Sequence, residues 1–215
     1  MTRDSRHSAV RSTYRHGDLR RVLLEAGIEL ARGGGPDAVV LREATRRAGV
    51  APNAAYRHFA SRQALLQAVR AAALAAVAGA MEIELATVPG NLSVADFARA
   101  NVRAVGTGYL RFAQAETGLF RTAFAASDKL LQRTPELPTA GPGGFNPYEL
   151  LGAAIDKLVA AVLLPPERRP GAEFLAWSAV HGLAMLVIDG PLATAVGPRM
   201  HEVGQRLLDM VEKGL

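Results

Sequence analysis

The sequence contains no cysteine and few aromatic side chains, which make up 6% of its 215 residues. Without cysteine there are no disulfides and no thiolate metal sites, and a reducing cytoplasm is the simplest compartment for the protein. The histidines are scattered and show no metal-ligand spacing, so we expect neither a metal nor a cofactor. These histidines are His7, His16, His58, His181 and His201.

Long hydrophobic runs and catalytic constellations are also missing. The most apolar stretch, Trp177 to Ile188, is shorter than a bilayer span, which requires about 20 residues, and it contains His181. The polar, charged N-terminus does not have the pattern of a signal peptide, so no membrane association is expected. No nucleophile with a base, no pair of carboxylates and no metal set has usable spacing, and we therefore do not expect an enzyme.

The chain does contain enough apolar sequence for a globular fold, together with an uneven distribution of charge. Hydrophobic residues make up 49% of the total and charged residues 21%, which is typical of globular proteins. Residues 1–70 carry 13 arginines and 6 acidic side chains, a balance of +7, and the remaining 12 basic and 14 acidic side chains give −2. A GC-rich genome would explain the preference for arginine but not this asymmetry. A basic head on a slightly acidic body predicts a polyanionic partner for the head.

Apolar residues recur at helical spacing along most of the chain, and strand-like alternation is absent, so an all-α fold is predicted. Leu19, Leu23 and Leu30, for example, belong to one apolar stripe. Asp18 can cap the start of this helix, and the glycines at 33–35 stop it. About nine helices are expected, over residues 19–33, 41–48, 52–58, 62–85, 93–114, 116–125, 148–164, 171–188 and 196–212.

Glycine and proline mark the connections between these helices. Residues 134–147 are rich in both and predict an irregular loop. The glycine-rich loops at Gly33 and Gly141 lack the Lys-Ser/Thr pair and the strand-loop-helix context of phosphate-binding loops, so we interpret them as connectors. The predicted organisation is a flexible basic arm over residues 1–16, a three-helix helix-turn-helix domain over 17–65 and a larger helical domain over 66–215.

The segment over residues 41–59 is the most informative part of the sequence. It predicts two short helices that meet at a tight turn holding Gly49, so that the first helix positions the second for the major groove of DNA. A groove about 12 Å wide admits a helix with small or polar side chains at its tip. That tip would be Pro52, Asn53 and Ala54. The amide of Asn53 can reach base edges, and Ala54 can contact a thymine methyl group.

A rim of donors around this tip would hold the DNA backbone. The free backbone amides of the helix that Ser61 caps can bind a phosphate, and the N-terminal arm can add contacts in a minor groove. Ala55 and Phe59 would face the other way, into the three-helix core. The alternative is that the hairpin is mere packing, but the basic head and the Tyr-x-His-Phe run favour DNA binding. The side chains predicted for the rim are Arg42, Tyr56, His58 and Arg62.

These residues resemble the TetR (tetracycline-repressor-type) family of bacterial regulators. The pattern of that family has a Gly-Val turn, then Leu-Tyr-x-His-Phe, then a Ser-Lys pair and an apolar run. Within residues 17–70 this chain has Gly49-Val50, Ala55-Tyr56-Arg57-His58-Phe59, Ser61-Arg62 and Ala64-Leu65-Leu66. The resemblance implies a regulator that binds DNA.

The sequence departs from the family pattern at four positions. Ala51 stands where a capping Ser or Thr is common, which weakens the helix start by about 1 kcal/mol. Ala55 replaces the usual Leu and Arg62 the usual Lys. Val40 stands where a phosphate-binding Thr is frequent. None of these changes removes the basic rim, so the DNA-binding prediction stands and the operator sequence is left open.

The C-terminal two-thirds of the chain holds most of the aromatic residues. Trp177 and His181 lie four apart on one helix face, and Gly182 follows. The resemblance implies that this Trp-x-x-x-His-Gly run belongs to a C-terminal domain type of TetR-like regulators that holds an effector pocket and the dimer interface. Aromatic residues at helical spacing are also typical of a plain core. The candidate pocket residues are Tyr109, Phe112, Phe120, Phe124, Trp177 and His181.

His181 has two interpretations. It can be a neutral, buried histidine that is bonded to a backbone carbonyl, or it can be a polar group of the pocket. A helical apolar context with one polar side chain is compatible with both, so the sequence leaves the choice open.

The helices expected over 171–188 and 196–212 carry more apolar surface than a small domain must bury on itself. In a two-fold homodimer they would form a four-helix bundle. The dimer would place its two recognition helices about 34–36 Å or more apart, which predicts a palindromic operator. The side chains concerned are Met185, Leu186, Ile188, Val203, Leu207, Leu208, Met210 and Val211.

The sequence therefore predicts a dimeric repressor that a small, largely apolar effector releases from double-stranded operator DNA. The effector would shift the helix over 62–85, which continues from the head into the body, and it can do so only if it binds the two states with different affinity. The alternative is a constitutive dimeric DNA-binding regulator with no effector. A cavity inside the aromatic cluster favours the first hypothesis, and a filled cluster favours the second.

Overall fold

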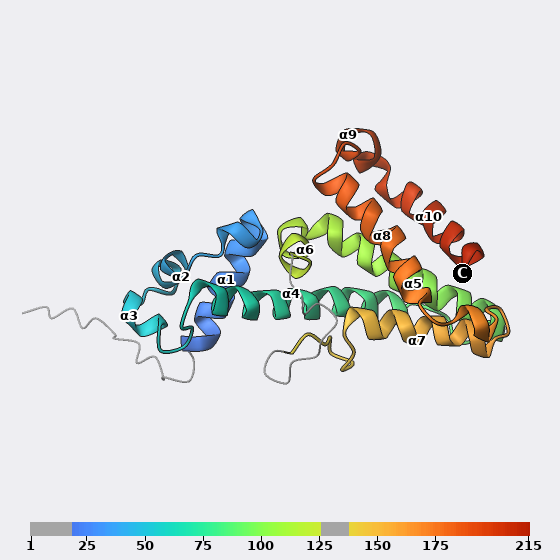
Figure 1. Cartoon of the computed structure of the whole chain (residues 1–215), viewed down its shortest axis with the longest axis horizontal. Coiled ribbons are helices and arrows are strands. Elements are labelled where there is room, and N and C mark those ends of the chain that lie inside the picture. The colour runs from blue at the N-terminus through green and yellow to red at the C-terminus, as the bar shows by residue number, and fades with distance from the viewer. Residues whose placement is uncertain (1–18, 126–137) are drawn as a thin grey trace, which may run out of the picture.

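The computed structural model describes residues 19–125 and 138–215, and in them every regular element is a helix (Figure 1). This confirms the all-α prediction. The basic arm expected over residues 1–16 and the cap expected at Asp18 lie outside the described residues.

The head of the molecule is a three-helix unit followed by the first turns of α4. Its helices are α1 (Leu19–Gly34), α2 (Leu41–Ala48) and α3 (Pro52–Ala55). Leu23 of α1 and Ala44 of α2 are fully buried between them, together with Ala55 and Phe59. The expectation that Ala55 and Phe59 face the core is therefore confirmed. The guanidinium carbon of Arg20 lies 4.7 Å from the centre of the Phe59 ring, which adds a cation–π contact to this small core.

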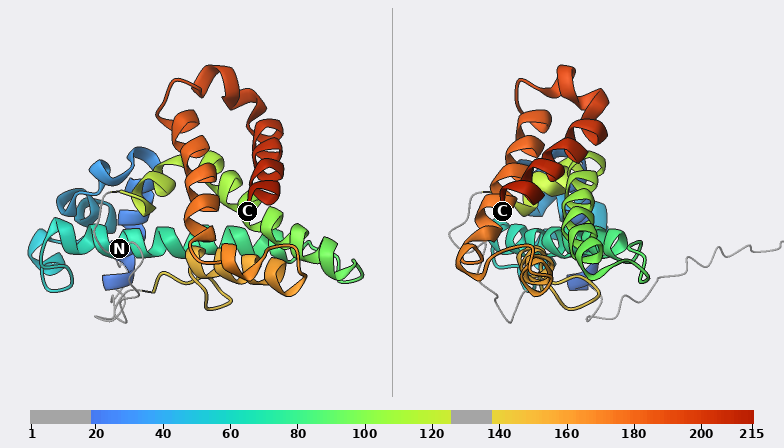
Figure 2. Two further views of the ribbon diagram at one scale, coloured as in Figure 1. Left: turned by 45° about the vertical axis from the view of Figure 1, so that its right-hand side comes forward. Right: turned by 90° about the vertical axis from the view of Figure 1, so that its right-hand side faces the viewer.

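The body is a helical bundle built around one long helix, α4, which runs from the head to the far end of the molecule (Figures 1 and 2). Helices α5, α6 and α7 pack on α4, and α8 and α10 pack on α5. The helices of the body are α4 (Arg62–Leu85), α5 (Val94–Ala115), α6 (Thr117–Ala123), α7 (Pro147–Ala160), α8 (Ala172–Ile188), α9 (Ala193–Val196) and α10 (Met200–Gly214).

Several helix ends follow from caps that the sequence displays. The hydroxyl of Ser61 accepts a hydrogen bond from the backbone N–H of Ala64 and begins α4, and Ser93 begins α5 in the same way. Gly35, with φ +69°, follows the last residue of α1. Asn146 begins α7 with a capping box, because Glu149 bonds back to its N–H.

Three helix boundaries differ from the prediction by three or four residues. The helix expected over 148–164 ends at Ala160, because Val162 has a positive φ of 57° and the N–H groups of Leu163 and Leu164 both bond to the carbonyl of Leu158.

The third helix ends at Ala55 and not at His58, because the N–H groups of His58 and Phe59 both bond to the carbonyl of Ala55 and close a turn. The last long helix begins at Met200, because Pro198 lacks an N–H and the chain forms the single turn α9 and a 3-10 turn before it.

Glycines let α5 approach its neighbours closely. A Cβ on Gly108 would lie 2.6 Å from the carbonyl oxygen of Ala80, so the backbones of α4 and α5 touch at this point. A Cβ on Gly106 would lie 2.2 Å from a methyl carbon of Leu208, which brings α10 against α5. Leu208 is thus buried within the protomer.

By length and composition alone, α4 could cross a membrane, with a mean hydropathy of 1.6 over its most apolar window. More than half of that window (56%) is buried inside the fold, as in the core helix of a soluble protein. Helices α8 to α10 pass the same test only if they count as one span, and they bend by 101° at their break. The stretch from Trp177 to Ile188 forms the greater part of α8.

Candidate functional site

The turn between α2 and α3 is built by Gly49. Its left-handed conformation, with φ +66° and ψ +28°, ends α2, and its N–H bonds to the carbonyls of Thr45 and Arg46. The N–H of Val50 also bonds to the carbonyl of Thr45. This turn fixes the angle at which α3 leaves α2, so that α2 supports α3 as a helix-turn-helix requires.

The predicted tip of α3 is open to solvent. Pro52 and Asn53 are exposed, and Ala54 is half-buried. Ala51 precedes α3 without a side-chain cap, as its methyl group implies. The exposed amide of Asn53 can therefore be offered to a groove, whereas Ala54 presents only part of its methyl group.

Three of the four predicted rim residues surround this tip. Arg42 and Tyr56 are exposed, and His58 is half-buried. The side chain of Arg42 makes no hydrogen bond or ion pair within the described part of the chain, so its guanidinium is available to a phosphate. Val40, at a position where a phosphate-binding Thr is frequent, is also exposed on this surface.

Arg62, the fourth predicted rim residue, has a structural role. Its Nε donates a hydrogen bond to the carbonyl of Val39 at 2.8 Å, and its Nη2 donates to the carbonyl of Pro36 at 2.9 Å. These bonds fasten the loop between α1 and α2 to the start of α4. Arg62 therefore positions the helix-turn-helix against α4 through Nε and Nη2, a role that the sequence did not indicate, and the predicted phosphate contact stays a prediction.

Sequence reasoning missed an ion-pair clamp on α2. Glu43 accepts hydrogen bonds from Arg46 at 2.6 and 2.9 Å and from Arg47 at 3.4 Å. The hydrogen bond from Arg46 is the main reason that the pKa of Glu43 falls to about 2. The signal was present as Glu–Arg pairs three and four residues apart on one helix. The clamp neutralises part of the charge of α2, whereas Arg42 stays unpaired among the residues that the structure describes.

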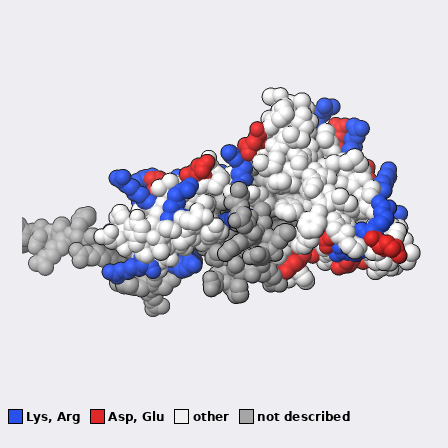
Figure 3. Space-filling model, viewed as in Figure 1, with Lys and Arg blue, Asp and Glu red and all other residues white. Residues whose placement is uncertain are grey.

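Positive charge borders the head on both edges in Figure 3, whereas the far end of the body mixes both signs. The basic and acidic counts for the sequence show the same asymmetry, with +7 in residues 1–70. Such a surface attracts a polyanion toward the end of the molecule that carries α2 and α3.

A pocket opens in the body between α4, α5, α7, α8 and α10. Its cavity has a volume of about 60 Å³, and most of its lining is apolar. No charged side chain is among the described residues that line it. The lining consists of Leu74, Met81, Val102, Val105, Gly106, Tyr109, Phe124, Thr139, Asn146, Pro147, Tyr148, Leu151, Ala176, Trp177, Val180, Leu208 and Val211.

Five of the six candidate pocket residues form one aromatic cluster. Its ring centres lie 4.9 to 6.4 Å apart for the pairs among Tyr109, Phe120, Phe124, Trp177 and His181. Only Tyr109, Phe124 and Trp177 of these line the pocket.

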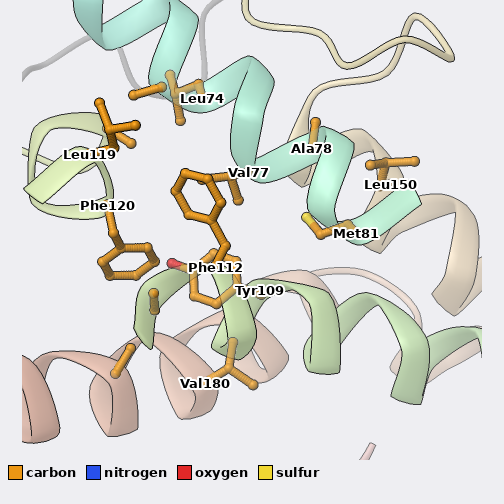
Figure 4. Packing of buried hydrophobic residues seen from close by; sticks show 14 of the residues in the cluster. Leu74, Val77, Ala78, Met81, Tyr109, Phe112, Leu119, Phe120, Leu150 and Val180 are labelled. Carbon is orange, nitrogen blue, oxygen red and sulfur yellow. The ribbon is translucent and has the colours of Figure 1, made fainter. Parts of the chain in front are cut away.

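Two of the candidate pocket residues belong to the core instead. Phe120 is fully buried behind Tyr109, and its ring meets that of Tyr109 edge to face at 5.2 Å. Phe112, which is 8% exposed, points from α5 toward Val77 of α4 (Figure 4). The prediction was wrong for both, because sequence spacing places residues on a helix but does not say which neighbour each face meets.

The polar centre of the cluster is a short chain of hydrogen bonds. The indole N–H of Trp177 donates to the Tyr109 hydroxyl oxygen at 3.1 Å, and this hydroxyl lies 2.8 Å from Nδ1 of His181. Since an indole can only donate, the hydroxyl hydrogen is left for Nδ1, which accepts it as part of a neutral imidazole. Burial raises the pKa of Tyr109 and lowers that of His181, so both stay neutral.

This chain of bonds corrects both interpretations of His181. Its partner is the Tyr109 hydroxyl and not a backbone carbonyl, and the imidazole does not line the pocket. His181 instead orients Tyr109, which does line it. The partner came from a residue 72 positions away, which the spacing of Trp177 and His181 could not indicate.

The loop that precedes α7 covers part of the pocket and is tied to α4. Oε1 of Glu82 accepts a hydrogen bond from the N–H of Gly143 at 3.0 Å. A Cβ on Gly141 would lie 2.8 Å from the same carboxylate, so any larger residue there would make the Glu82 side chain shift. Thr139 and Asn146, at the two ends of the loop, reach the pocket. The glycines at 141–144 are thus connectors, as predicted, with a defined anchor.

Helix α6 joins the head to the body. A Cβ on Gly118 would lie 2.3 Å from the carbonyl oxygen of Ala31, so α6 lies directly on the end of α1. Nε of Arg32 donates to Glu116 at 2.8 Å, and Arg121 of α6 forms an ion pair with Asp189 at 3.2 Å. Because α6 also packs on α4, a displacement of α6 would change its contacts with both α1 and α4.

The outer face of α8 is largely apolar, and together with Met210 of α10 it has no partner within the described chain. Leu175 of α8 is 67% exposed and Met210 of α10 is 61% exposed, and Leu186 is also exposed. A Cβ on Gly182 would meet nothing within 4 Å. The surface over α8 in Figure 3 is nearly free of charge. Leu208 and Val211, which were predicted for this face, are instead buried inside the protomer, where they line the pocket.

Two family models match this chain. One, described as the tetracyclin repressor-like C-terminal domain, matches residues 102–211, and one described as bacterial regulatory proteins of the tetR family matches residues 23–69. The two matches cover the pocket and the helix-turn-helix respectively. No curated protein was found to be similar to the chain.

Solved structures share the whole architecture. A protein with unknown function from Rhodococcus sp. RHA1 is 26% identical, with a TM-score of 0.69 over 95% of this chain and 98% of that one. The TetR family regulator PfmR from Thermus thermophilus is 19% identical, with a TM-score of 0.55 over 90% and 98%. A TetR variant from Acinetobacter baumannii AYE, in complex with minocycline, is 20% identical, with a TM-score of 0.55 over 89% and 93%. The last two likenesses concern the fold.

Proposed function

The chain belongs to the TetR family of bacterial transcriptional regulators, and we propose that it is a dimeric repressor, which a small and largely apolar effector releases from a palindromic operator. It acts in the cytoplasm and catalyses no reaction. The observation that carries the proposal is the continuity of α4, which begins beside the helix-turn-helix and ends beside the pocket.

The DNA-binding half of the proposal rests on the surface of α2 and α3. Pro52, Asn53 and Ala54 form the tip that enters the major groove, with Asn53 reading base edges. Arg42, Tyr56 and His58 contact the phosphates on either side, and Arg62 keeps the head in position on α4. The exposed guanidinium of Arg42, unpaired within the described residues, supports this division of roles.

The effector half rests on the pocket. A largely apolar lining with a few polar groups is typical of small-molecule sites. The aromatic cluster itself is packed ring against ring, but Tyr109, Phe124 and Trp177 at its edge line the pocket, and a pocket beside the cluster favours an effector. The solved TetR variant that holds minocycline has the same fold and supports the same use of the body. The effector acts by favouring a position of α4 and α6 that changes the separation of the two heads.

The dimer is formed by α8 and α10. Their exposed apolar side chains, Leu175, Leu186 and Met210, would be covered by the same face of a second copy. The open space at Gly182 allows the partner helix to come close. A four-helix bundle across a two-fold axis follows, and with it an operator of two inverted half-sites.

Salt-dependent binding to the protein's own operator tests the DNA-binding half. Once the operator is known from selection, we expect Arg42→Ala and His58→Ala each to reduce the slope of log affinity against log salt by about 1, because each removes a phosphate contact. Arg168→Ala changes an exposed arginine of the turn between α7 and α8 and serves as the matched control, with an unchanged slope. Unchanged slopes for both head variants would remove them from the rim.

Base preference tests the tip separately. Asn53→Ala should relax the preference at one operator position, at a cost of about 1–3 kcal/mol for the preferred base. If this variant binds every sequence more weakly by the same factor, Asn53 does not read bases.

A further inference from the structure

Arg70 on α4 is a buried cation that the proposed mechanism does not use. The residue is 6% exposed, and its Nε donates a hydrogen bond to the carbonyl of Ala123 at 3.1 Å. Its Nη2 is buried and has no hydrogen-bond partner within the described chain. Burial lowers the pKa of Arg70, and no carboxylate of the described residues acts in the opposite direction.

The hydrogen bond to the carbonyl of Ala123 accounts for Nε of Arg70 but not for the buried Nη2. Ala123 is the last residue of α6, and a cation at the end of a helix stabilises the partial negative charge of its carbonyls. A guanidinium, however, has five N–H donors in a planar fork, and a buried donor without a partner is costly. The fork suits a carboxylate, which can accept two parallel hydrogen bonds.

Arg70 lies just beyond the end of the pocket that is nearest to the head. Leu74 follows it by one turn on the same face of α4, and Phe124 follows Ala123 directly. Both Leu74 and Phe124 line the pocket. Figure 4 shows Leu74 beside Leu119 of α6, at the junction of α4 and α6. Arg70 itself does not line the pocket, so at least Leu74 and Phe124 would have to move for a group inside the pocket to reach the guanidinium.

We propose that the effector is an amphipathic monocarboxylate, whose apolar body fills the pocket and whose carboxylate pairs with Arg70. This inference rests on the effector half of the proposed function. A single negative charge fits because Arg70 carries a single positive charge and the described lining of the pocket adds no other. A phosphate monoester, with close to two negative charges at neutral pH, would bury one of them without a partner.

The pairing would act where the head meets the body. The carboxylate would sit between α4 and the end of α6, and it would share the guanidinium with the carbonyl of Ala123 or replace that carbonyl. Either change alters the contact of α6 with α4. Since α6 also lies on α1, the change reaches the head directly.

Matched acids and esters test the pairing. We would titrate the full-length dimer with dodecanoic acid and biphenylcarboxylic acid, each beside its methyl ester, and measure binding by calorimetry. The wild-type protein should bind at least one acid about tenfold or more tightly than its ester, as expected of a charge-assisted hydrogen bond in a buried site. Arg70→Met should remove that preference and leave the affinity for the ester unchanged. Arg70→Lys should keep the positive charge but lose the planar set of guanidinium donors, and it should therefore retain part of the preference for the acid over its ester.

The outcomes separate this inference from the proposed function. Equal affinities for acid and ester, or a preference that survives Arg70→Met, would overturn it while leaving an effector pocket in place. Failure of all four compounds to bind would also overturn it. If Arg70 only caps α6, Arg70→Met will lower the thermal stability and leave the acid-to-ester ratio unchanged. If Arg70→Met does not fold, the test rests on the ratio of acid affinity to ester affinity in the wild type and in Arg70→Lys. A ratio near one in the wild type rejects the pairing.

Discussion

Tyr109 is the residue on which the polar centre of the body depends. Its hydroxyl on α5 accepts from Trp177 and donates to His181, so one oxygen atom joins two side chains of α8 that lie 68 and 72 positions away in the sequence. The hydroxyl is buried, and water cannot easily replace it as a partner.

Removing that oxygen should destabilise the body. In Tyr109→Phe the indole N–H of Trp177 loses its acceptor, and we expect the free energy of unfolding to fall by about 1–3 kcal/mol. Urea denaturation measures the change. Tyr148→Phe is the matched control, because Tyr148 also lines the pocket and its hydroxyl makes no hydrogen bond within the described residues. Equal losses for the two variants would show that the network contributes nothing.

The burial of His181 predicts a pH dependence of stability. Burial lowers the pKa of the folded imidazole below that of an unfolded histidine, near 6.5. As the pH falls through this value the unfolded chain takes up a proton first, so the stability present at neutral pH is lost toward the lower folded pKa. His181→Asn should flatten the decline in urea midpoint between about pH 7 and pH 5.

Exposed His201 provides the control for this experiment. His201→Gln should leave the decline unchanged, since the charge of an exposed side chain is solvated in both states. If the urea midpoint of His181→Asn falls with pH as steeply as that of the wild type, other titrating groups cause the decline.

Residue roles were predictable where the local pattern sufficed and not where a distant partner decides. The helix-turn-helix tip followed from Gly49 and Pro52, whose effects are local. Arg62, Glu82 and Arg70 all bond to backbone groups 23 or more positions away. Such bonds depend on how helices cross, and no spacing in the sequence encodes them.

At the scale of elements, α6 is the piece that links ligand site and head. It is short, it packs on both α1 and α4, and its last carbonyl is held by Arg70. Its position depends on Gly118, which lets it touch the end of α1.

A methyl group at Gly118 should separate these elements. In Gly118→Ala the new Cβ would overlap the carbonyls of Ala31 and Arg32, which are backbone atoms and cannot turn aside. We expect a loss of about 1–3 kcal/mol in the free energy of unfolding, together with weaker operator binding. Gly33→Ala, where a Cβ meets nothing within 4 Å, is the control and should not destabilise the protein. An unaffected Gly118→Ala would mean that α6 and α1 are free to move apart.

Most helices of the fold were predictable because each carries its own start and stop signals, such as Ser61 before α4 and Ser93 before α5. The boundaries that failed lie at the ends of α3 and α7 and before α10, where a short helix or a turn is decided by contacts with its neighbours. The pocket could not be derived from its aromatic residues, since helical spacing leaves open whether Phe112 or Tyr109 faces a cavity.

At the scale of the whole molecule, the proposed dimer interface on α8 and α10 would bring two heads together. A charge on this face should separate the protomers, because Leu186→Glu would bury two like charges across the two-fold axis. Sedimentation velocity should show a dimer for the wild type and a dissociation constant at least about tenfold higher for the variant.

The control for this prediction is another exposed apolar residue. Ile83 of α4 is 68% exposed and lies away from α8 and α10 in the sequence, so Ile83→Glu should remain dimeric. A dimer that Leu186→Glu leaves intact would place the interface elsewhere.

Selection of binding sites from random double-stranded DNA, with the purified full-length protein, tests the central claim most directly. A dimer with two recognition helices should enrich an inverted repeat, with half-sites one helical turn of DNA or a multiple of it apart. The Leu186→Glu variant should enrich that repeat much less strongly. Failure to enrich any sequence, or enrichment of a single asymmetric site by the wild-type protein, would contradict the account.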